Sequence, residues 1–212
     1  MDDCRLRHCS FSETTSLSSV TLNLKHQLNN NSDGFRHVLP NLTSLEILDC
    51  YTIGVLAPCL KPIEFSDCKP WALKKLTLHG IHLNRQSNYV QYPISTFMPE
   101  LILLLKRAKN IEELWIEDST ESDELYHDNF NKCIFKDVTL DRLETLSFVF
   151  DGESPVSLEL FKSILPCLPA LVNLNIGYSS IVLDSTEQKW VVESVSEFCR
   201  ALPNVKLTYF RI

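Results

Sequence analysis

The chain has 212 residues, among them 33 leucines and only five glycines, and its 20 basic and 27 acidic side chains give a formal charge of −7. This length suffices to bury a sizeable core, and a hydrophobic content of 44% excludes a disordered or low-complexity chain. The acidic balance argues against nucleic acid as a partner, because such binding depends on lysine and arginine neutralising phosphates. The composition therefore predicts a leucine-rich globular protein.

The two ends of the chain and its cysteines bear on the cellular compartment. Residues 1–6 contain no basic segment followed by an apolar stretch, so they predict no secretory signal. The longest apolar run, 101–105, is far shorter than the roughly 20 residues that span a bilayer. Eight cysteines would suit a secreted disulfide framework, but they are scattered and fit reduced, mostly buried thiols better. We expect a cytoplasmic or nuclear protein without a membrane partner.

An apolar frame of the form Leu-x-x-Leu-x-Leu, with conservative replacements, recurs along the chain. Weak copies begin at Met1 and Leu17, and clear copies begin at Leu42, Leu73, Ile111, Leu143, Leu171 and Leu202. The last two apolar positions of each copy are two residues apart, which places them on one face of a short strand. The intervals between clear copies are 28 to 38 residues long, so each has room for a helix.

Three helices can be placed in these intervals. The first is predicted over 99–107, where proline and glutamate open the segment and two cations close it, as the helix dipole favours. The second begins at 154–155, a Ser-Pro pair, and carries apolar side chains on one side. The third begins at 185–188, which resembles a capping box.

Alternating strands and helices of this kind predict an α/β fold class. Each unit has too little apolar surface to fold alone, but stacked units bury a continuous core. We expect a curved solenoid, with a parallel β-sheet on the concave face and helices on the convex face. Residues 1–212 would form a single domain of about seven irregular repeats.

The frame resembles the leucine-rich repeat superfamily. Cysteines at the ninth position, Cys9 and Cys50, resemble its long, helix-containing classes, which include ribonuclease-inhibitor-like proteins and the repeat arms of F-box proteins. The Leu-Pro sequences at 39–42, 168–171 and 202–205 are most similar to fungal or plant F-box repeat arms. The resemblance implies the fold and, within F-box proteins, the substrate-recognition arm of a ubiquitin ligase. A ubiquitin-ligase adaptor is an expected partner only if an F-box lies outside this chain.

Both ends of the chain are repeat-like strands without a visible polar capping unit. Exposed terminal repeats favour aggregation, and solenoids normally cover them. Two interpretations stay open. Either a divergent cap covers each end, or the chain is a fragment of a longer protein or has its ends covered by a partner.

The side chains that alternate with the apolar strand positions would line the concave surface. Trp115 stands out, because an aromatic side chain on a solvent-facing sheet is a typical binding anchor; a loop folded over it is the competing interpretation. A histidine beside it would contact a ligand or simply be solvated. The predicted binding residues are His79, Trp115, Glu117, Ser147, Asn175 and Lys206.

Residues 112–128 contain eight carboxylates and no lysine or arginine. They predict either a negative patch that steers a basic partner or a solubilising loop. The glycine-containing spacing of a calcium loop is absent, so calcium is not expected. The loop part of this acidic patch consists of Glu121, Asp123, Glu124 and Asp128.

Catalysis and metal binding have weak candidates. Cys133 and His127 are the nearest nucleophile-and-base pair in the sequence, but nothing in the sequence orients them. Cys4, His8 and Cys9 lack a second ligand pair for zinc. We therefore expect a non-enzymatic module, without cofactor or metal, that binds another protein. A small-molecule or regulatory sensor, with its ligand near Trp115, is the alternative.

Overall fold

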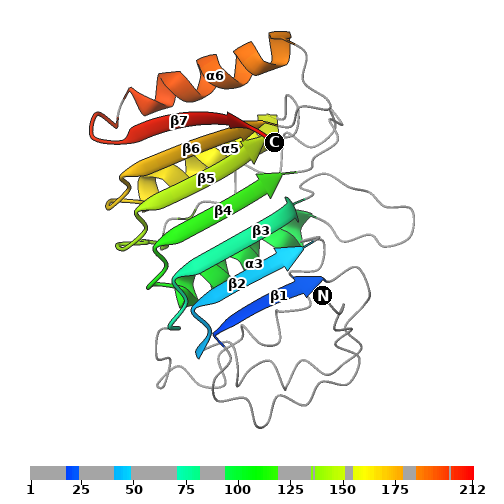
Figure 1. The fold of residues 1–212 in the computed structure, drawn as a ribbon, viewed down its shortest axis with the longest axis vertical. Helices are drawn as coiled ribbons and strands as arrows, with labels where there is room; N and C mark the ends of the chain where they lie inside the picture. Colours follow the sequence, from blue (N-terminus) through cyan, green and yellow to red (C-terminus); the bar gives the residue numbers. More distant parts are fainter. Residues whose placement is uncertain are drawn as a thin grey trace.

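The structure is a computed structural model that describes residues 18–23, 41–48, 71–81, 94–118, 135, 137–150, 155–178, 185–200 and 202–212. Within these segments, seven parallel strands form one sheet, and their order in the sheet follows their order in the chain (Figure 1). The strands are β1 (Ser19–Asn23), β2 (Ser44–Leu48), β3 (Lys75–Ile81), β4 (Glu113–Asp118), β5 (Thr145–Phe150), β6 (Asn173–Tyr178) and β7 (Lys206–Arg211).

Three α-helices are described between the strands. They are α3 (Ile94–Arg107), α5 (Pro155–Ile164), which continues into the 3-10 helix η3 (Leu165–Cys167), and α6 (Ser185–Cys199). Figure 1 shows α3 and α5 behind the sheet and α6 beside β7, at the end of the sheet. This arrangement confirms the predicted α/β class with a parallel sheet.

The apolar frame explains the strand register. Leu45 of β2 lies opposite Leu76 of β3, and Leu114 of β4 lies opposite Leu146 of β5. The weak copy that begins at Leu17 also forms a strand, β1, and its central residue pairs with β2 in the same register. Equivalent positions of the repeats therefore stack across the sheet. The weak copy that begins at Met1 lies outside the described residues.

The stacked apolar positions form the core on the side of the sheet that α3 and α5 cover. The first position of the frame is buried as well, as Leu42, Leu73 and Ile111 illustrate. Fully burying a leucine stabilises the fold by roughly 1.5–3 kcal/mol, so the repeated frame supplies most of the driving force for folding. The helices contribute Leu101 and Phe161, among others, to the same continuous cluster.

Two boundaries differ from the sequence prediction. The last copy of the frame was placed two residues early, because Leu207 rather than Val205 pairs with Leu174 of β6. The alternation of faces has period two, so this shift leaves each β7 side chain on its predicted face. The first helix begins at Ile94, five residues before the predicted start at Pro99. Pro99 therefore lies inside the helix, which continues through it although a proline there removes one backbone hydrogen-bond donor and crowds the carbonyl of residue i−4.

Candidate binding site on the polar face

The strands present a second set of side chains on the face opposite α3 and α5, which we call the polar face. In a strand these side chains alternate with the buried ones. Register across the sheet places them in rows that run from β1 to β7. The middle row of the polar face consists of Thr21, Glu46, Thr77, Trp115, Ser147, Asn175 and Thr208.

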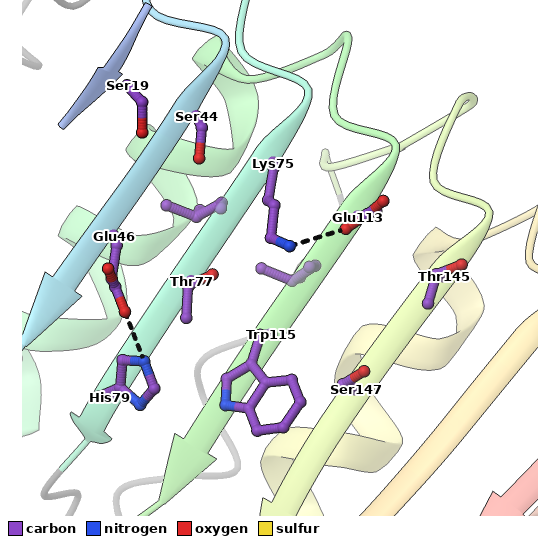
Figure 2. A pocket seen from close by; sticks show the side chains of 12 residues that line it. Ser19, Ser44, Glu46, Lys75, Thr77, His79, Glu113, Trp115, Thr145 and Ser147 are labelled. Atoms are coloured by element: carbon purple, nitrogen blue, oxygen red, sulfur yellow. Dashed lines mark hydrogen bonds and ion pairs between the residues drawn. The ribbon is translucent and has the colours of Figure 1, made fainter. Parts of the chain in front are cut away.

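The polar face contains a shallow hollow of about 410 Å³ over strands β1 to β5 (Figure 2). Short hydroxyl side chains leave space between longer ones, and Trp115 is the large aromatic group at its border. The residues that line the hollow are Ser19, Ser44, Glu46, Lys75, Leu76, Thr77, His79, Glu113, Leu114, Trp115, Thr145 and Ser147.

One imidazole links two carboxylates across three strands. His79 Nε2 lies 3.1 Å from Glu46 Oε1, and His79 Nδ1 lies 2.5 Å from Glu117 Oε2. On its other oxygen, Glu46 accepts a hydrogen bond of 2.7 Å from the hydroxyl of Thr21. An imidazolium donates from both ring nitrogens and satisfies both carboxylates, whereas a neutral imidazole donates to only one of them. The cluster therefore links four strands through side-chain contacts.

A β-bulge lies at this histidine. The register between β3 and β4 shifts between Leu78 and Ile81, where β3 has one residue more than its neighbour. Gly80 lies in the bulge with φ of 64°, a left-handed conformation that glycine adopts without steric cost. Bulges locally re-aim the side chains of a strand. This one lies next to the residue that contacts both carboxylates.

Trp115 lies between two other rings. Its ring centroid is 6.5 Å from that of His79 and 5.5 Å from that of Phe210, at interplanar angles of 42° and 47°. Its indole Nε1 is buried and has no hydrogen-bond partner among the described residues. A buried donor without a partner costs about 1–3 kcal/mol.

The structure brings together most of the predicted binding residues. His79, Trp115 and Ser147 line the hollow, and Glu117 contacts His79 without lining the hollow itself. Asn175 lies on the adjoining strand β6, and its Nδ2 donates a hydrogen bond of 3.1 Å to Ser147 Oγ.

Other predicted residues lie elsewhere. Lys206 is at the start of β7, outside the lining of the hollow. Glu121, Asp123, Glu124 and Asp128, the loop part of the acidic patch, lie outside the described residues.

Several lining residues were not predicted. Ser19, Ser44, Lys75, Glu113 and Thr145 form the row two residues before the middle row, and Lys75 Nζ pairs with Glu113 Oε2 at 3.2 Å. They occupy the third position of the frame, directly before its central apolar residue, so counting that position as part of each strand would have identified them. The contact of Phe210 with Trp115 was also missed.

The described residues offer no metal site. They contain no group of three or more His, Cys, Asp or Glu side chains that could hold an ion. Glu46 and Glu117 lie on opposite nitrogens of His79, so no single point is shared by all three groups. The sequence candidates Cys4, His8 and Cys9 lie outside the described residues, as do Cys133 and His127.

Two free cysteines are described, Cys167 and Cys199. Burial raises the pKa of both thiols, which disfavours the reactive thiolate at neutral pH. Cys167 Sγ also lies 3.6 Å from the carbonyl oxygens of Phe135 and Ser163. These contacts fit the predicted role of a packed, reduced thiol.

No protein-family model, curated protein or solved structure matches the chain. None of the helices in the described segments is long and apolar enough to cross a membrane. The site is thus characterised by its geometry: a hollow bordered by one tryptophan, several hydroxyls and charged groups held in pairs or in the histidine cluster.

Proposed function

We propose that the chain is a leucine-rich-repeat solenoid that acts as a protein-interaction module and binds its partner on the polar face. The sequential order of the parallel strands, with α3 and α5 behind them, supports the solenoid. In this proposal the sheet is curved and the polar face is its concave surface. The large repeated surface, rather than a deep cavity, favours a macromolecular partner.

The observation that carries the proposal is Trp115 at the border of the hollow. Tryptophan is the residue type most enriched among those that contribute most to interfaces, because it buries a large area at low entropic cost. Here it is surrounded by hydroxyl and charged groups that can form the polar rim of an interface, such as Thr77 and Glu113. The net charge of −7 further favours a partner with a basic surface.

Within this class, we propose the substrate-recognition arm of an F-box-type ubiquitin ligase in the cytoplasm or nucleus. The support for this step is the similarity of the repeats to F-box repeat arms. An adaptor of the ligase would bind only through an F-box outside this chain. The polar face would then recruit the protein to be ubiquitinated.

Affinity capture from the native source, followed by mass spectrometry, tests the binding role. The bait is the full chain, compared with Trp115→Ala and with Thr208→Ala, a variant on the same row but outside the hollow. Loss of an interface anchor worth about 2 kcal/mol or more weakens binding roughly 30-fold, so partners should be depleted with Trp115→Ala and retained with Thr208→Ala. Equal recovery with all three baits would contradict the proposal.

A small-molecule sensor is the second candidate, and the volume of the hollow favours it. About 410 Å³ falls within the range of roughly 300–1,000 Å³ that is typical of ligand pockets. A ligand that binds the folded state raises the melting temperature. A thermal-shift screen with a metabolite panel discriminates the two, since stabilisation that disappears in Trp115→Ala would support the sensor.

A further inference from the structure

The C-terminal strand sends one side chain across the polar face. Phe210 is on β7, yet its ring contacts Trp115 on β4, with 5.5 Å between the centroids. Because neighbouring strands are about 4.8 Å apart, the two residues start from backbones three strands apart. The ring therefore lies along the sheet and covers the strands between them.

Gly177 makes this path available. A Cβ atom at this position of β6 would lie 2.6 Å from Cζ and 2.8 Å from Cε2 of Phe210, which is closer than real Cβ contacts. The ring thus occupies the space where any other residue would carry its side chain. The register pairs Gly177 directly with Phe210, so the contact is a cross-strand one.

Val149 of β5 lies beside the same position of β6. Its Cγ2 lies 2.9 Å from the same Cβ position on the opposite side, and the residue is only 1% exposed although it belongs to the polar face. Ser147 of the same strand is 7% exposed. Strand β5 is therefore buried on both faces, which breaks the alternation seen in β2.

We propose that Phe210 is a positioning residue of the binding site. It holds Trp115 at the border of the hollow and covers the polar face around Gly177, so that a partner docks in the hollow beside it. The positioning of Trp115 depends on the side-chain arrangement alone, whereas the docking of a partner rests on the proposed function. Phe210 acts through Trp115, and Gly177 acts by leaving room for it.

Tryptophan fluorescence tests the positioning directly. In a chain that carries Trp71→Phe and Trp190→Phe, Trp115 is the single reporter. We expect Phe210→Ala to shift its emission to the red and to increase its quenching by acrylamide, and Phe210→Tyr, which keeps the ring, to restore the parent values. Thr208→Ala on the same strand and face is the matched control and should leave both quantities unchanged.

The outcome that overturns the proposal is an unchanged emission maximum and quenching constant in Phe210→Ala. If circular dichroism shows that this variant does not fold, Gly177→Ala replaces it, because the added Cβ displaces the ring and leaves its apolar volume in place. A parent-like Trp115 signal in Gly177→Ala would then overturn the proposal. Partner capture with Phe210→Ala is read separately: altered fluorescence with undiminished capture keeps the positioning role and contradicts docking at this site.

Discussion

His79 connects three neighbouring strands on the polar face. It lies on β3 and contacts carboxylates from β2 and β4, and one of these carboxylates accepts a further hydrogen bond from β1. The three side chains are 29–39% exposed, so water screens their attraction. Partly exposed ion pairs contribute little to stability. The cluster therefore orients the carboxylates beside the hollow more than it stabilises the fold.

The small energetic contribution of His79 is testable by substitution. We expect His79→Ala to lower the free energy of unfolding by about 1 kcal/mol, because the contacts with Glu46 and Glu117 are lost at a partly exposed site. Urea denaturation measures this value. Lys206→Ala, on the same face without a described side-chain partner, should change it by less than about 0.5 kcal/mol. A loss above about 3 kcal/mol for His79→Ala would identify the cluster as a stabilising element instead.

For individual residues, the sequence predicted the face of the sheet on which a side chain lies better than it predicted the contacts of that side chain. The apolar frame placed His79 and Trp115 on one face, because alternation in a strand follows from local spacing. It did not predict Phe210 beside Trp115. That contact requires the absence of a side chain at Gly177, the observed alignment of strands β4 to β7, and a phenylalanine ring that lies along the sheet. Such conditions depend on side-chain packing, which the spacing of leucines does not encode.

At the scale of elements, the bulge in β3 is the local feature that distinguishes this strand from its neighbours. It inserts one residue next to His79, at the carboxyl end of the strand. The prediction from sequence gave β3 the same regular frame as the others, because a lone glycine in a strand also occurs without a bulge. Gly80 adopts its left-handed conformation where the register between β3 and β4 shifts.

Substitution of Gly80 tests whether the bulge requires glycine. With φ of 64°, a Cβ atom at this position is strained, and we expect Gly80→Ala to lower the free energy of unfolding by about 1–2 kcal/mol. Gly80→Asn is the matched variant, because asparagine tolerates the left-handed region better, and it should cost less. Equal stability of Gly80→Ala and the parent in chemical denaturation would contradict a strained bulge.

At the scale of the molecule, the strand order determines how stability is distributed. Each strand makes its extensive contacts with the strands that precede and follow it in the sequence. The sequence predicted that each strand pairs with the next strand in the chain, because the apolar frame recurs at intervals long enough for one strand and one helix. The two ends of the sheet, β1 with β2 and β6 with β7, therefore share few direct interactions and are linked through the intervening strands.

Hydrogen exchange can show whether this arrangement makes the two ends independent. Leu207 pairs with Leu174 and packs partly buried against the core, so its truncation to alanine removes apolar contacts between β7 and the core. We expect Leu207→Ala to accelerate amide exchange in β6 and β7 and to leave β2 unchanged, because local opening follows contiguous contacts. Leu45→Ala, at the equivalent position of β2, is the mirror control and should accelerate exchange in β1 to β3 only. Equal acceleration in all seven strands for either variant would mean that the sheet opens as one cooperative unit.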